Sequence, residues 1–351
     1  MVAARRRLTA SGYCRKDAYE SLALSFANGD VERCCCLAAE LACTPGEPGT
    51  LVGTLIDTYA QWHITGSLAV VARLAHAFAD LDGQPSVMRS FAGNAVMRRS
   101  LCDAVIIPAS LPRRACSELW KTKQPSSPLP PFEEGDSEAG VSAVRLMVQE
   151  GNGRGAVSIA AVLLSSRSKD MPPPSGDLPV RKPHDRDVAW HLWNVASETA
   201  ATMSESVQLF VRASLRMYSQ RFTLQRRTAR ANLLCYALLT CARGRVASSS
   251  PLEEHLEVLL QAAHDKIDDV FDDILSRPTL QQNADDLEAL DADAEADGGD
   301  EEGDDEDKSV DYMRCYTRFD NQLRCRLADE RRHPEVPSNI KHITVVSKHK
   351  A

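Results

Sequence analysis

The chain has 351 residues and 43% hydrophobic residues, which suffices for one large or two ordinary domains with real cores. No stretch approaches 18 uncharged apolar residues, so the sequence predicts no transmembrane helix. The net charge of −8 is uneven: 14 acids lie between Asp285 and Asp307, and the rest carries 41 basic and 35 acidic residues. We therefore expect a mildly positive folded body with an acidic tract attached to it.

Residues 1–120 are predicted to form an N-terminal antiparallel helical-hairpin array. In Lys16–Ala27 the apolar residues recur at helical spacing, and Asn28-Gly29-Asp30 can end that helix and cap the next one. The expected helices span residues 16–27, 31–43, 50–63, 67–80 and 86–107. Breaks are expected at Gly66, at residues 82–85 and at Pro108.

The next region, residues 121–184, is predicted to consist of Pro/Gly-rich linkers around a small apolar segment at 141–164. Residues 185–278 then form a predicted basic C-terminal helical domain, in which Trp190 and Trp193 are expected to seat the first helix. Its expected helices span residues 186–202, 204–221, 224–243 and 252–275.

The end of the chain divides into two predicted parts. Residues 279–309 contain the acidic tract and bury too little apolar surface to order themselves, so we expect disorder there. Residues 310–351 are expected to hold a last helix, at about 310–330, and an extended tail that could add a strand at 340–346. The whole chain is therefore predicted to be all-α, with disordered linkers and an acidic tract.

The strongest candidate site is the stretch from Val207 to Val246, which carries eight arginines and no Asp or Glu. Arginine binds phosphate and carboxylate oxygens with its planar fork, so the stretch predicts a polyanion-binding surface. Aromatic side chains at Tyr218 and Phe222 are close enough in sequence to offer a stacking surface. The candidate polyanion-binding residues are Arg212, Arg216, Arg221, Arg226, Arg227 and Arg230.

Other interpretations of the charged segments stay open. The arginines could instead solvate a helix face or pair with the acids of residues 252–273. The acidic tract at 285–307 could dock onto the basic helices of its own chain or serve as a solubilising linker. The carboxylates of residues 264–273 could bind a metal, although the amphipathic pattern of that helix explains them equally as an acidic outer face.

The sequence contains no recognised catalytic, cofactor or metal motif, so we expect no cofactor, no bound metal and no enzymatic activity. The 11 cysteines are an odd number, and Cys34, Cys35 and Cys36 are consecutive, which does not suit a disulfide framework. Since no apolar run of signal-peptide length follows the first residues, we expect a protein that is not secreted and works in a reducing compartment.

Three segments together resemble a known family. They are RKDAYESLALSFANGDVERCCCLAAELACT at 15–44, DVAWHLWNVASE at 187–198 and RRTARANLLCYALLTC at 226–241. The pattern resembles an uncharacterised helical protein family shared among nucleocytoplasmic large DNA viruses, and it covers about 40% of the chain. The resemblance implies a viral setting, in the host cytoplasm or nucleus or in the virion. It implies no catalytic residue.

The leading functional prediction is a non-enzymatic interaction or scaffold protein whose basic helices contact an acidic protein or nucleic acid. The alternative is a nucleic-acid-binding accessory factor of viral replication or transcription. Binding to random DNA at several salt concentrations separates the two. A nucleic-acid-binding factor binds with an affinity that falls steeply as salt rises, whereas a pure scaffold shows no such dependence. The sequence leaves open whether the two helical regions pack together.

Overall fold

The computed structural model describes residues 8–44, 47–82, 94–111, 136–165, 171–174, 178–179, 186–248 and 250–276. Within these ranges the structure is all-helical and has no named strand, as predicted. The predicted acidic tract, last helix and extended tail all lie outside the described residues, as do all of residues 121–135.

The N-terminal helices follow the predicted pattern closely. They are α2 (Arg15–Asn28), α3 (Val31–Cys43), α4 (Pro48–Thr58), the π-helix η1 (Tyr59–His63), α5 (Leu68–Leu81) and α6 (Ala95–Ser110). Gly29 ends α2 in the left-handed conformation (φ 67°), and the Asp30 side chain accepts from the Arg33 N–H to cap α3. The Asn28-Gly29-Asp30 turn is thus confirmed.

The second half contains two helices where we expected a small apolar segment. These are α8 (Ser137–Gln149) and α9 (Gly153–Ser165), which form a hairpin. After them come α10 (Val188–Ala201), α11 (Glu205–Ser219), the 3₁₀ turn η3 (Leu224–Arg226), α12 (Arg227–Arg243), α13 (Glu254–His264) and α14 (Ile267–Ser276).

Two predicted boundaries are wrong. The helix does not break at Pro108, because α6 continues to Ser110. A proline so close to the C-terminal end removes one late hydrogen bond, and a final turn still closes from the Leu111 N–H to the Pro108 carbonyl (3.1 Å). The single helix expected at 252–275 is two helices with a break at Asp265 and Lys266; both pack on α6, and the second also packs on α3.

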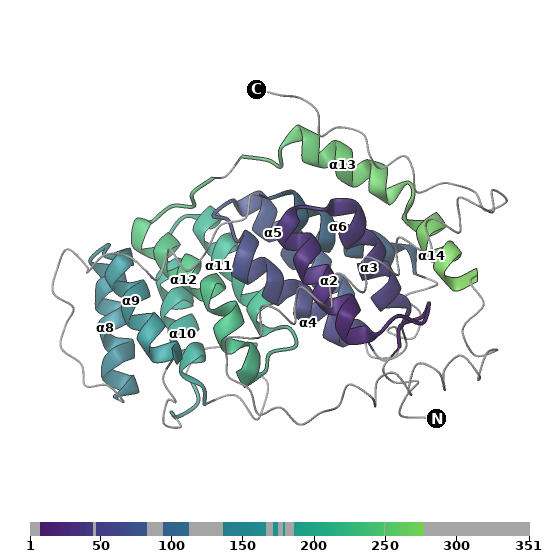
Figure 1. Cartoon of the computed structure of the whole chain (residues 1–351). Helices are drawn as coiled ribbons and strands as arrows, with labels where there is room; N and C mark the ends of the chain where they lie inside the picture. Colours follow the sequence, from purple (N-terminus) through teal and green to yellow (C-terminus); the bar gives the residue numbers. More distant parts are fainter. Residues whose placement is uncertain are drawn as a thin grey trace, which may run out of the picture.

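The helices pack side by side in one continuous row (Figure 1). Along the row, successive contacts join α8, α9, α12, α11, α5, α6, α3 and α2. Helix α10 packs against α8, α11 and α12, while α4 and η1 contact α12. Because α5 packs on α11, the N-terminal array and the C-terminal helices share one hydrophobic core.

The π-helix η1 lies at the junction of the two halves and is hydrogen-bonded to α12. The buried Asn232 side chain of α12 donates to the Ala60 carbonyl in η1 (2.9 Å). This contact ties α12 directly to the N-terminal half.

Candidate functional site

Helix α11 carries its arginines on a solvent-facing stripe. Its opposite face is buried and includes Val207, Phe210 and Tyr218. The exposed positions fall three or four residues apart and so lie on one face of the helix. They are Glu205, Leu209, Arg212 and Arg216.

Arg230 on α12 has the opposite environment, since its side chain is 0% exposed. Its Nε donates to Asp57 Oδ1 (2.6 Å), and its Nη1 donates to the Tyr218 carbonyl (2.9 Å) and to the Gln220 carbonyl. Its Nη2 lies 3.5 Å from the Gly53 carbonyl. The guanidinium is therefore enclosed by acceptors from α4 and from the end of α11. The prediction that Arg230 binds an external polyanion is wrong.

Asp57 on α4 accepts from two arginines at once. Arg226 Nη1 lies 2.8 Å from Oδ2, and Arg230 Nε lies 2.6 Å from Oδ1. Burial raises the pKa of Asp57, and the attraction and hydrogen bonds of both arginines counter part of that rise. Burial also disfavours the charged form of Arg230 and so lowers its pKa, while the neighbouring Asp57 opposes that change. Mutual pairing therefore offsets only part of the cost of removing these charges from water.

Two further arginines of the stretch also pair with acids inside the chain. Arg221 has a left-handed backbone (φ 49°), and its Nε donates to Asp82 Oδ1 at the end of α5 (2.5 Å). Arg227 Nη1 donates to Asp187 Oδ2 (2.8 Å), while the other oxygen of Asp187 caps α10. We call the side chains of Arg221, Arg226, Arg227 and Arg230, with Asp57, Asp82 and Asp187, the arginine seam.

Glycines on α4 make room for the seam. Gly49, Gly53 and Asp57 are four residues apart and share one face of that helix. A methyl group on Gly53 would overlap the Arg226 guanidinium, and one on Gly49 would lie 3.3 Å from Arg221 Nη1. The missing side chains let both guanidinium groups lie against the α4 backbone and reach their carboxylates.

The seam corrects the sequence interpretation in a second way. Pairing with acids was one of the open alternatives, but the predicted partners were the carboxylates of residues 252–273. The observed partners come from α4, from the end of α5 and from the start of α10. Arg221, Arg226 and Arg227 therefore already have carboxylates in the fold, and their charge contributes little to any outer surface.

The predicted stacking surface is also wrong, because Tyr218 and Phe222 are buried. Their rings stack with centroids 5.2 Å apart, and Trp190 meets both of them edge-on at 5.6 and 5.0 Å. The Trp193 ring lies 5.3 Å from the Tyr218 ring. These four aromatic side chains form a core cluster between α10 and α11, which confirms that Trp190 and Trp193 seat α10.

Arg212 and Arg216 remain exposed, as the polyanion prediction requires. Within the part of the chain that the structure describes, neither makes an ion pair, and the Arg212 Nε lies 3.4 Å from the Gln208 carbonyl of its own helix. Leu209 on the same stripe is 42% exposed. We call Leu209, Arg212 and Arg216 the α11 stripe.

The acidic helix of residues 264–273 is held in internal contacts. Its apolar residues Ile267, Phe271 and Ile274 are buried, whereas Asp268 and Asp272 pair with Arg98 of α6. His264 Nε2 lies 2.9 Å from Asp103 Oδ1. Among the described residues, no three His, Cys, Asp or Glu side chains are grouped so that they could hold a metal ion. In the same residues, no helix has the length and apolar character needed to cross a membrane.

Sequence reasoning found the arginines but missed their acids. Asp57, Asp82 and Asp187 lie on separate segments, up to 173 positions from the arginine that each one meets. One local signal was available: the Gly49, Gly53, Asp57 spacing puts two side-chain-free positions beside a carboxylate on one helix face. Such a face suits close approach by a long cationic side chain.

Comparison of the chain with protein-family models, with curated proteins and with solved structures found no match.

Proposed function

We propose that the chain is a non-enzymatic interaction or scaffold protein that binds an acidic protein partner through the α11 stripe. The observation that supports this proposal is the exposure of Arg212 and Arg216 beside Leu209 on a helix whose other face is fixed in the core. The resemblance noted in the sequence supports a large DNA virus as the setting, with the protein in the host cytoplasm or nucleus or in the virion.

The combination of two positive charges and one apolar side chain on the α11 stripe favours an acidic protein segment as its partner. The guanidinium groups of Arg212 and Arg216, one helical turn apart, can each bind a carboxylate, and the exposed Leu209, one turn before Arg212, offers an apolar contact. A partner helix or strand with alternating acidic and apolar side chains would match both features. Since the seam occupies four arginines, the surface has fewer free cations than the sequence alone indicates.

The alternative proposal, a nucleic-acid-binding accessory factor, draws on a second pair of exposed arginines. Arg243 is the last residue of α12 and Arg245 lies two positions beyond it; both line an open depression with Val246 and Ala247. Polyanion binding there would be nearly independent of nucleic-acid sequence and would weaken steeply with salt. The two proposals therefore assign the partner to different arginine pairs.

The acidic tract at 285–307 is a candidate occupant of the α11 stripe. It contains Leu287 and Leu290 among its acids, so it has the same mixed chemistry as the proposed partner. In this proposal the tract competes with an external partner for Arg212 and Arg216. Removing the tract then strengthens binding of any other acidic ligand at the stripe.

The test uses the chain that lacks residues 285–307 and a labelled synthetic peptide of residues 285–307 as the probe. We expect saturable peptide binding that weakens about tenfold or more when Arg212→Ala and Arg216→Ala are combined, since two charge-assisted contacts are lost. The matched control, Arg243→Ala with Arg245→Ala, is expected to bind as tightly as the parent.

The second probe is a random DNA duplex at about 50 and about 200 mM salt. Tight DNA binding that falls steeply with salt and depends on Arg243 and Arg245 would replace the protein-partner proposal by the nucleic-acid alternative. Peptide binding that is unaffected by the α11 substitutions, in variants with unchanged helical content, would contradict the α11 stripe as the site.

A further inference from the structure

The last two described helices form a strap across the N-terminal half. We call residues Glu254–Ser276 the strap. In Figure 1 α13 runs above α5 and α6, and α14 lies at the far end beside α3. The contacts of α13 are with α6, and those of α14 are with α3 and α6. A segment that follows α12 in sequence therefore packs on helices from the beginning of the chain.

The strap is seated like an amphipathic helix in a groove. Leu256 and Leu260 of α13 are buried, as are Ile267, Phe271 and Ile274 of α14. The α14 anchors are spaced at i, i+4 and i+7, which is the pattern by which a helix ligand fills a hydrophobic groove. The α3–α6 face thus provides an apolar binding surface with a defined register.

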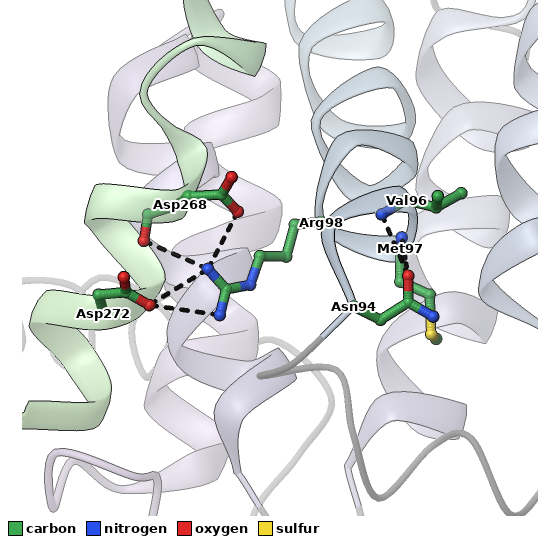
Figure 2. A network of polar contacts seen from close by, with 6 residues as sticks. All are labelled: Asn94, Val96, Met97, Arg98, Asp268 and Asp272. Atoms are coloured by element: carbon green, nitrogen blue, oxygen red, sulfur yellow. Dashed lines mark hydrogen bonds and ion pairs between the residues drawn. The ribbon is translucent and has the colours of Figure 1, made fainter.

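One buried arginine recognises α14 specifically. Arg98 of α6 is 7% exposed and donates from Nη1 to Asp268 Oδ1 (3.0 Å) and to the Asp268 carbonyl (3.3 Å). Both of its Nη atoms also lie 3.3 Å from Asp272 Oδ1, as Figure 2 shows. The Arg98 guanidinium carbon lies 4.8 Å from the centre of the Phe271 ring.

A second polar contact fixes the end of α13. His264 Nε2 lies 2.9 Å from Asp103 Oδ1, and Arg73 Nε donates to Asp103 Oδ2 (2.6 Å). Asp103 follows Arg98 on α6 by five positions, so the two contacts hold the strap at both sides of its break. The groove is therefore complementary to this strap in charge as well as in apolar shape.

The described residues that connect α12 to the strap are largely exposed. Its first residue, Gly244, has φ 64° with open space around the position of a side chain. Farther along, Ser248 bonds the backbone of Gly66 and Leu68, and Ser250 and Pro251 are exposed. Movement of the strap about the exposed Ser250 and Pro251 can therefore leave the backbone hydrogen bonds of Ser248 and the core of either half in place.

We propose that the α3–α6 face is a docking groove for the strap of a second copy of this chain, so that two copies can exchange straps to form a dimer. The groups that recognise the strap lie on α3, α5 and α6, and a second copy of the chain carries an identical strap that fits them. An exchanged dimer would repeat the observed contacts between chains, which is a low-cost route to association. At low protein concentration each groove is occupied by the strap of its own chain, because the tether gives that strap a high effective concentration.

The main test uses two full-length variants with reciprocal charges. One is Arg98→Glu, and the other combines Asp268→Arg with Asp272→Arg. Alone, each variant has a mismatched strap contact. In an equimolar mixture an exchanged heterodimer restores both contacts, so we expect heterodimer by native mass spectrometry. The triple variant that combines all three substitutions is matched within one chain and is expected to stay monomeric.

A second variant keeps the test decisive if Arg98→Glu fails to fold. Deleting residues 247–249 shortens the connection so that the strap cannot reach its own groove, and exchange then gives a dimer at all measurable concentrations. The same deletion with Asp268→Arg and Asp272→Arg is expected to be monomeric. A folded deletion variant that stays monomeric, or folded reciprocal variants that form no heterodimer, would overturn the proposal. It does not depend on the α11 stripe, whose peptide-binding readout is separate.

Discussion

Arginines in one short stretch of sequence have opposite environments in the fold. On α11, Arg212 and Arg216 face solvent beside Leu209, whereas at the start of α12 Arg230 is fully buried against Asp57. The density of positive charge in the sequence is similar in both places. What differs is whether the fold brings a carboxylate from a distant helix, and backbone carbonyls from the end of α11, to the guanidinium. A basic stretch thus indicates a ligand surface only where the fold leaves its charges unmatched.

The reason is the cost of removing charge from water. A buried guanidinium is tolerated only when its donors are hydrogen-bonded and its charge is paired. Arg230 meets these conditions through Asp57 and the carbonyls of Tyr218 and Gln220. Arg212 and Arg216 stay hydrated and keep their charge available. Three variants probe this contrast and a fourth probes the strap, in order from the largest expected effect to the smallest.

The largest effect is expected for Arg230→Met. It leaves Asp57 with one fewer partner and leaves the carbonyls of Tyr218 and Gln220 without the Arg230 donor. The free energy of unfolding should therefore fall by about 3–5 kcal/mol. Urea unfolding followed by circular dichroism measures the change. Arg216→Met is the matched control and should lie within about 0.5 kcal/mol of wild type. Equal losses in the two variants would contradict the distinction between seam and stripe.

Gly53→Ala should also destabilise the protein, by about 2 kcal/mol, because the new methyl group overlaps the Arg226 guanidinium and displaces it from Asp57. The usual effect of replacing a helical glycine by alanine is a gain of about 1 kcal/mol. The sign should therefore revert to a gain in the Arg226→Ala background, where the overlap is gone. A loss of the same size in both backgrounds would show that Arg226 is not the cause.

Asp103 predicts a pH effect at the strap. Burial alone would raise its pKa, but hydrogen bonds from His264 and Arg73 outweigh burial and leave the pKa below its ordinary value of 3.8. A lowered folded-state pKa contributes stability above the unfolded-state value, and that contribution is lost as pH falls through the folded-state value.

We therefore expect Asp103→Asn to cost about 1.5 kcal/mol near pH 5 and progressively less toward pH 2. Urea unfolding of both proteins across this range measures the difference. A gap between wild type and variant that stays constant with pH would rule out the charged form of Asp103 as the source.

The smallest stability effect is expected for Arg212→Ala combined with Arg216→Ala, at about 0.5 kcal/mol or less, because both side chains lie on an exposed helix face. Thermal unfolding provides the measurement. A large loss would mean that these arginines stabilise the fold, and it would remove the basis for treating them as a binding surface.

Much of the fold was predictable because it is encoded locally. Apolar periodicity located most helices, and the Asn28-Gly29-Asp30 turn was read from residue types alone. The two boundary errors, at Pro108 and at residues 265–266, lie where the helix ends differ from those that the local residue types predict. The apolar segment at 141–164 proved to be the α8–α9 hairpin, whose partner α12 is distant in sequence.

The candidate site was less predictable because its character depends on nonlocal pairs. The arginines were identified correctly, yet Tyr218 and Arg230 could be recognised as core residues only once α10 and α4 were placed beside them. Position within a helix gave part of the answer, since Arg212 and Arg216 fall opposite the apolar face of α11. The aspartates that pair with the seam arginines lie on other segments, and no pattern in the sequence near the arginines indicates them.

The most direct test of the arginine seam is a double-mutant cycle between Arg230 and Asp57, with Arg230→Met, Asp57→Leu and the combined variant compared by urea unfolding. A buried pair predicts a coupling energy of about 2 kcal/mol or more, so the double variant should lose less stability than the two single losses together. Losses that add to within about 0.5 kcal/mol would show that the two side chains do not interact in the folded protein. Arg230 would then have to be returned to the set of candidate ligand-binding residues.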